Sequence, residues 1–170
     1  MNIYKKVSIT TNYGNIILEL NHEKAPKTVE NFILYVKEGF YDGTIFHRII
    51  DNFMIQGGGF SKGMIQKNTH NPIENEAFNG LKNLAYTIAM ARTNEIHSAT
   101  SQFFINLVDN NFLDYTAPTI NGWGYTVFGK VIEGIDTVDK IGKLKTKNFG
   151  FYQDVPIDDV IMKKVELIYK

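Results

Sequence analysis

Two stretches of this chain combine a cation, amides and bulky apolar side chains at spacings that suit the binding of a small apolar group. In the first stretch, residues 46–60, Arg48 and Gln56 lie close to Phe53 and Met54. The pattern predicts two short β-strands around a tight turn, closed by a run of glycines. A half-buried strand normally turns apolar side chains inward and polar ones outward. A fixed positive charge and an amide beside an aromatic ring and a thioether instead indicate a recognition site.

The second stretch, residues 101–106, places two kinds of side chain on opposite faces of one predicted strand. Successive strand residues point to opposite faces, so Gln102, Phe104 and Asn106 share one face. The other face, which includes Phe103, is apolar and is expected to pack in the core. An aromatic ring on the polar face suits a surface pocket for an apolar substrate group.

Length and charge exclude several classes of function. The chain has 170 residues, which we interpret as a single domain, 1–170. Its formal net charge is +0, so nucleic acid is not expected as a partner, because binding phosphates needs an excess of cations. Lysines gather at Lys143, Lys145 and Lys147, and we interpret them as part of a solvated loop.

The chain has neither cysteines nor histidines at the spacing of metal ligands. The chain has no cysteine, which excludes disulfides, thiol nucleophiles and cysteine-based metal sites. Its histidines lack the spacing of metal ligands, so we expect no metal. No long apolar segment is present, so we expect no signal peptide, no membrane association and a cytoplasmic location.

Periodicity predicts the elements that must position the two stretches. Residues 7–10 and 15–20 flank a turn and predict a β-hairpin. Apolar residues at helical spacing predict a helix that begins near Pro26 and ends before Gly39. Further strands are predicted at 87–91, 102–107, 126–132 and 159–169, a short helix at 134–141, and long loops at 61–81 and 109–124.

This inventory predicts a mainly β fold of about eight strands and two helices. The pattern alone allows either a β-barrel or a β-sandwich. A closed barrel has no edge strands, which would explain how a chain so rich in strands stays monomeric. We therefore expect a monomer.

Residues 46–60 resemble the signature of the cyclophilins, which are peptidyl-prolyl cis-trans isomerases, and residues 101–106 resemble the second motif of that family. The resemblance runs over nearly the whole chain, and the segments 90–92 and 112–114 look like bacterial members. It implies an eight-stranded antiparallel β-barrel capped by two α-helices. It also implies a cofactor-free isomerase whose substrates are proline-containing peptides and unfolded or folding proteins.

The resemblance further implies which residues act and which bind. The catalytic residues would be Arg48, Phe53 and Gln56. The proline pocket, the groove beside it and its rim would be formed by Met54, Ala91, Arg92, Gln102, Phe104, Phe112, Leu113 and Tyr125. Within this set Arg48 would donate a hydrogen bond to the twisted prolyl amide, since its guanidinium group is planar, always charged and unable to act as a base.

Some positions depart from the pattern of many eukaryotic cyclophilins, which carry tryptophan, histidine and asparagine where this chain has Phe112, Tyr125 and Arg92. All of these positions belong to the groove or its rim, so isomerisation should be intact and cyclosporin binding weak. The segment 115–124 is also longer than the usual family loop. It holds Trp123, which we interpret as a packing anchor, with a contact at the groove rim as the second reading.

Two other functions compete with catalysis. A binding or chaperone module for proline peptides would have no need of a transition-state donor, so Arg48 favours the enzyme. A carbohydrate- or ligand-binding β-sandwich would require both motifs to be coincidence. Acid–base catalysis by His47 is not needed for this reaction, and we expect a structural, hydrogen-bonded histidine. The glycines 57–59 lack phosphate-loop spacing and predict a sharp bend or a close backbone approach.

Overall fold

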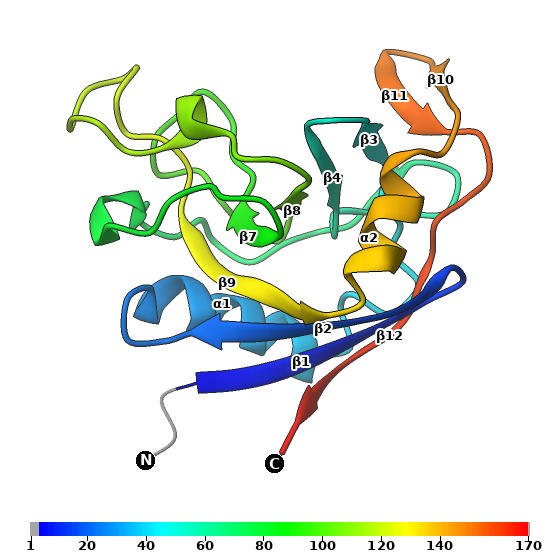
Figure 1. The fold of residues 1–170 in the computed structure, drawn as a ribbon, viewed down its shortest axis with the longest axis horizontal. Coiled ribbons are helices and arrows are strands. Elements are labelled where there is room, and N and C mark those ends of the chain that lie inside the picture. Colours follow the sequence, from blue (N-terminus) through cyan, green and yellow to red (C-terminus); the bar gives the residue numbers. More distant parts are fainter. Residues whose placement is uncertain (1–3, 170) are drawn as a thin grey trace.

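The computed structural model describes residues 4–169, and antiparallel strands dominate it (Figure 1). The largest sheet has eight strands in the order β12-β1-β2-β9-β7-β8-β4-β3. In chain order these strands are β1 (Tyr4–Thr11), β2 (Gly14–Asn21), β3 (Arg48–Ile50), β4 (Met54–Gly57), β7 (Thr87–Met90), β8 (Phe103–Asn106), β9 (Val127–Glu133) and β12 (Met162–Ile168). Every neighbouring pair is antiparallel.

The sheet curls into a half-barrel whose two edge strands approach each other. Between β3 and β12 the described residues form no ladder; instead Ile45 and Ile161, just before these strands, form a single bridge. Beside it the Phe46 N–H donates to the Val160 carbonyl at 3.0 Å. The predicted fold class is thereby confirmed as mainly β with eight antiparallel strands and two helices, and the barrel is joined by this bridge rather than by a full ladder.

The two helices cover different parts of the curled sheet. Helix α1 (Pro26–Lys37) contacts β2 and β12, and helix α2 (Ile135–Gly142) contacts β2, β3 and β4. The buried stripe of α1 centres on Phe32, whose ring lies 5.2–5.5 Å from the rings of Tyr41, Phe103 and Phe128. The helix ends before Gly39, whose φ of +70° suits the left-handed conformation that follows many helices. Both helices match their predicted positions within a few residues.

A residue distant in the sequence completes the start of α1. The residue before the helix, Ala25, has no side-chain acceptor for the free N–H groups of the first turn. Glu76 supplies the acceptor, because its carboxylate receives the Thr28 N–H and the Thr28 hydroxyl, each at 2.7 Å. Glu76 is itself buried, so the segment predicted as a plain surface loop is fixed against the helix.

Several short elements were not predicted. They are β5 (Phe60–Ser61) with β6 (Ile65–Gln66), the hairpin of β10 (Thr146–Phe149) and β11 (Tyr152–Pro156), and the 3-10 turns η1 (Ala77–Asn79) and η2 (Asn111–Leu113). Each is brief, and η1 and η2 fall inside the segments predicted as long loops. Within residues 4–169 no helix is long and apolar enough to cross a membrane.

Candidate active site

Strand register brings the two sequence stretches together. Arg48 on β3 pairs directly with Gln56 on β4, and Gln56 pairs with Phe104 on β8. Directly paired residues of antiparallel strands lie side by side on the same face of the sheet. Residues from three separate strands therefore form one row across the sheet.

A hollow of about 140 Å³ lies beside this row. Its lining residues are Arg48, Phe53, Met54, Gln56, Ala91, Arg92, Phe104, Leu113 and Tyr125. Met54, Phe104 and Leu113 are buried and give it an apolar floor. Pockets for drug-sized ligands occupy roughly 300–1,000 Å³, so this hollow suits a single small apolar group.

The polar side of the pocket is a chain of hydrogen bonds. Arg48 Nη1 donates to Gln56 Oε1 at 3.3 Å, and Gln56 Nε2 donates to Gln102 Oε1 at 2.9 Å. A guanidinium has five N–H donors and an amide two, so both Arg48 and Gln56 keep donors available for a bound molecule. No carboxylate in the described part of the chain forms an ion pair with Arg48, so Arg48 is not held in a surface salt bridge there.

The glycines after β4 make room for this arrangement. Gly58 has a φ of +88°, and a Cβ there would lie 2.8 Å from the Phe103 ring and 2.9 Å from that of Tyr41. At Gly59 a Cβ would lie 2.5 Å from Cγ of Gln102. A side chain at either position would displace these groups, which confirms the predicted bend and close approach.

The opposite wall is built around Arg92. Its Nε donates to the Gly124 carbonyl at 3.0 Å, and its guanidinium lies over the Tyr125 ring, 4.5 Å from the centroid. Tyr125 in turn meets Phe104 edge to face at 5.8 Å. Arg92 is therefore held by a carbonyl and a cation–π contact and forms a fixed wall.

Two predicted site residues lie just outside the hollow. Phe112 is 71% exposed and packs against Phe53 with ring centroids 5.7 Å apart, which extends the apolar surface beyond the pocket. Gln102 lines a neighbouring hollow of about 310 Å³ that shares Gln56, Ala91 and Arg92 with the first. The structure thus places nine of the eleven predicted site residues around one hollow, Gln102 in the hollow beside it and Phe112 against Phe53.

His47 does not have the predicted hydrogen bond. Its ring is buried against Phe60, with centroids 4.5 Å apart, and its Nδ1 has no partner among the described residues. Burial, with the positive charge of Arg48 as the smaller cause, lowers the pKa of His47 to about 4. The side chain is a packed neutral imidazole at physiological pH, so packing takes the place of the expected hydrogen bond.

A network of buried asparagines supports the pocket and was missed in the sequence. Asn110 Nδ2 donates to the Phe53 carbonyl at 3.0 Å and to Asn106 Oδ1 at 2.8 Å. Asn106 Nδ2 donates to Asn83 Oδ1 at 3.1 Å, and Asn83 Nδ2 donates to the Leu113 carbonyl at 3.2 Å. The network therefore fixes the backbone of two pocket residues. Asn106 stood out on the polar face of its strand, but its partners come from loops whose positions the sequence does not predict.

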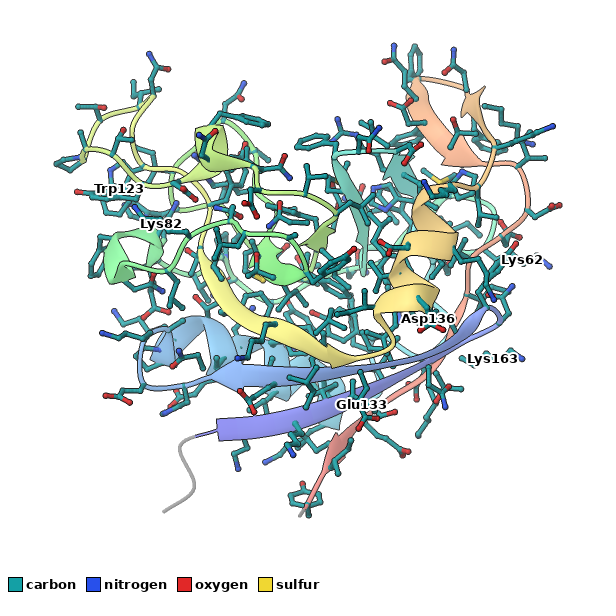
Figure 2. All side chains as sticks on the ribbon, in the orientation of Figure 1. Lys62, Lys82, Trp123, Glu133, Asp136 and Lys163 are labelled. Carbon is teal, nitrogen blue, oxygen red and sulfur yellow. The ribbon has the colours of Figure 1, made fainter. Side chains whose placement is uncertain are left out.

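Trp123 packs away from the pocket. Its ring contacts those of Phe78, His97 and Tyr115 at centroid distances of 5.3–6.1 Å. Figure 2 shows it within the long loop at one edge of the molecule. These contacts agree with a packing anchor rather than a contact at the groove rim.

Another hollow, of about 280 Å³, lies over β2, β7 and β9 and contains none of the predicted site residues. It is lined largely by apolar groups, including Leu81 and Leu84, together with Lys82 (Figure 2) and Lys130. Lys130 already lies 4.0 Å from Glu19 in an ion pair. The groove around Arg48 is therefore the candidate active site.

Several known proteins are similar to this chain in sequence. The family model for cyclophilin-type peptidyl-prolyl cis-trans isomerases matches residues 6–167. The peptidyl-prolyl cis-trans isomerase cyp18 of Streptomyces antibioticus is 58% identical over 162 residues, covering 95% of this chain and 98% of that protein. Peptidyl-prolyl cis-trans isomerase B of Escherichia coli K12 is 56% identical over 159 residues, covering 94% and 97%.

Solved structures show the same fold. A cyclophilin-type isomerase of Cryptosporidium parvum superposes with a TM-score of 0.77 at 29% identity, covering 98% of this chain and 99% of that one. A structure of that isomerase obtained in the presence of the dipeptide Ala-Pro gives a TM-score of 0.76, also at 29% identity, with coverage of 97% and 99%. With a family match that spans nearly every residue, this chain belongs to the cyclophilin-type peptidyl-prolyl cis-trans isomerases.

Proposed function

We propose that this protein accelerates rotation about Xaa-Pro bonds by holding the proline ring in the hollow of about 140 Å³ while Arg48 donates a hydrogen bond to the prolyl nitrogen. The observation that carries the proposal is the place of Arg48. It lies at an apolar pocket, hydrogen-bonded to Gln56 and without an ion pair in the described residues.

The chemistry of the reaction explains why such a donor would be effective. The barrier to rotation, about 18–20 kcal/mol, reflects the loss of amide resonance as the bond twists. In the twisted state the nitrogen regains a lone pair, which it lacks in the planar ground state. A donor aimed at this lone pair binds the transition state more strongly than the ground state, and only such differential binding raises the rate.

The required acceleration is within reach of this site. Uncatalysed exchange takes tens to hundreds of seconds, so turnover in milliseconds needs about five decades, or about 7 kcal/mol. A charge-assisted hydrogen bond in a pocket that excludes water supplies part of this. Positioning of the substrate supplies the remainder.

Neighbouring residues would supply that positioning. The amide N–H that Gln56 retains would donate to a backbone carbonyl of the substrate, and its bond to Gln102 fixes its orientation. Met54, Phe104 and Leu113 would contact the proline ring. Neither step needs a cofactor or a proton transfer.

Exchange spectroscopy on a short Xaa-Pro peptide tests the proposal. The protein should increase the cis–trans exchange rate, and kcat/KM should be nearly flat between about pH 6 and 8, because neither an arginine nor a histidine with a pKa of about 4 titrates there. Absence of acceleration would contradict the activity. A bell-shaped profile within that range would instead point to acid–base catalysis.

A further inference from the structure

The hairpin of β10 and β11 exposes aromatic side chains next to lysines. Phe151 is fully exposed, Phe149 is 45% exposed and Tyr152 is 39% exposed. Lys145 and Lys147 are also exposed, and neither forms an ion pair with a described residue. Neighbouring large apolar side chains on a protein surface commonly mark a site of interaction.

This hairpin lies beside the strand that carries Arg48. Strand β11 contacts β3, and both stand on the same side of the molecule in Figure 1. The Tyr152 ring meets Phe60 edge to face at 5.4 Å, and Lys143 Nζ lies 4.0 Å from Asp51 in the turn after β3. Tyr152, which pairs with Phe149 beside the turn of the hairpin, and Lys143, which precedes β10, therefore hold the hairpin near β3, while Phe149 and Phe151 remain exposed.

The residues on the hairpin fit a particular kind of partner. Aromatic rings give a large contact area at low cost in conformational entropy, so Phe149 and Phe151 suit apolar side chains of an extended chain. The unpaired Lys145 and Lys147 attract carboxylates and repel cationic side chains. The protein's formal net charge of +0 gives no general attraction to an anionic membrane, which favours a polypeptide as the occupant.

We propose that the hairpin of β10 and β11 binds an apolar, acidic segment of the same client polypeptide whose proline occupies the pocket. The inference rests on the proposed isomerase function and adds to it a preference among substrates. An extended chain spans about 3.3 Å per residue, so a few residues beyond the proline suffice to leave the groove. Clients with such a segment would bind more tightly than short peptides with the same Xaa-Pro bond.

Matched peptides and variants test this inference by exchange spectroscopy. One peptide contains the Xaa-Pro bond alone. Longer peptides add a segment rich in leucine and glutamate before or after the proline, and companions carry either serine in place of leucine or lysine in place of glutamate. With the unaltered protein, KM for one of the leucine–glutamate peptides should be about tenfold lower than for the short peptide, and each companion should show a smaller gain.

The double substitution F149S/F151S should abolish this gain and leave kcat/KM for the short peptide unchanged. Tyr169→Ser provides the matched control, because Tyr169 is 77% exposed and follows β12 near the C-terminal end, away from the hairpin (Figure 1). K145S/K147S should remove the preference for glutamate over lysine and keep that for leucine over serine.

Several outcomes would overturn the inference. Equal KM values for all peptides, or an unaltered gain in F149S/F151S, would remove the hairpin from client binding and leave the isomerase function standing. Loss of short-peptide turnover in F149S/F151S would place the hairpin inside the catalytic site instead. Self-association or binding to anionic vesicles that depends on Phe149 and Phe151 would assign the surface to another occupant. No turnover of any peptide by the unaltered protein would contradict the isomerase function itself.

Discussion

Arg48 and His47 are neighbours in the chain with opposite surroundings. Strand alternation turns Arg48 toward the groove, where it keeps free donors, and turns His47 into the packing against Phe60. The pKa of about 4 at His47 arises mainly because burial disfavours the charged imidazolium. Arg48 is thus free to bind a substrate, whereas protonation of His47 makes the stability of the fold depend on pH.

His47 makes the protein less stable as the pH falls. An unfolded histidine, with a pKa near 6.5, gains a proton as the pH falls, whereas folded His47 stays neutral until about pH 4. The stability that neutral His47 provides is complete above about pH 6.5 and is lost as the pH falls toward 4. Between about pH 7.5 and 4.5 the loss should be about 2–3 kcal/mol.

Urea unfolding of the unaltered protein and of His47→Gln, at about pH 7.5 and pH 4.5, measures this loss of stability. The glutamine does not titrate, so its variant should lack this part of the loss, and other titrating groups cancel in the comparison. Parallel pH dependences of the two proteins would mean that His47 is not the titrating group.

Phe112 is expected to affect how tightly the groove rim binds cyclosporin. Its phenyl ring supplies apolar surface at the rim but no N–H donor, unlike the indole of many eukaryotic relatives. A cyclosporin carbonyl placed there would lose water without gaining a partner, at a cost of about 1–3 kcal/mol. Weak binding is expected, and Phe112→Trp should tighten it by about one to two decades with little effect on peptide turnover. Calorimetry that shows tight binding by the unaltered protein, or no gain in the variant, would refute this assignment.

Helix α1 illustrates how an element depends on a distant residue. Its apolar stripe is visible in the sequence, but its N-terminal N–H groups need an acceptor, which Glu76 supplies. The carboxylate also suits the partial positive charge at a helix N-terminus. Removing this side chain would leave the buried Thr28 N–H and hydroxyl without partners.

Glu76→Ala should therefore lower the free energy of unfolding by about 2–4 kcal/mol. Glu76→Gln keeps an acceptor and should lower the free energy of unfolding by less. Glu74→Ala is the matched control, since Glu74 is exposed in a surface ion pair with Lys27 and should cost at most about 1 kcal/mol. If denaturant unfolding showed equal losses of stability in Glu74→Ala and Glu76→Ala, the capping role of Glu76 would be contradicted.

Elements that bury one face could be predicted from the sequence, and features that depend on distant contacts could not. Helix α1 and the long strands were predictable because each buries one face and so leaves a periodic pattern. The β10–β11 hairpin was not, because most of its residues are exposed and give no apolar face to detect. In the site, Arg48, Gln56 and Phe104 were predictable from two contiguous motifs. The roles of Asn110 and Glu76 depend on contacts with distant segments, which no local pattern specifies.

At the scale of the whole molecule, the curled sheet brings distant segments to one groove. The bridge between Ile45 and Ile161 holds the two ends of the sheet together directly before β3, the strand that begins with Arg48. The long loop that holds Trp123 and the β10–β11 hairpin stand at opposite edges of the molecule (Figures 1 and 2). The monomeric state and the cytoplasmic location stay predictions from the sequence.

The central claim is that Arg48 stabilises the twisted amide. Kinetics of Arg48→Ala on a short Xaa-Pro peptide tests it most directly, with the far-UV circular dichroism spectrum and peptide binding measured in parallel. We expect kcat/KM to fall by at least about two decades, or about 2.7 kcal/mol of transition-state stabilisation, because Arg92, the other cation that lines the pocket, is held by the Gly124 carbonyl and the Tyr125 ring. The fold should be unchanged, and peptide binding should change far less than turnover. Near-normal turnover in a correctly folded Arg48→Ala protein would contradict the account.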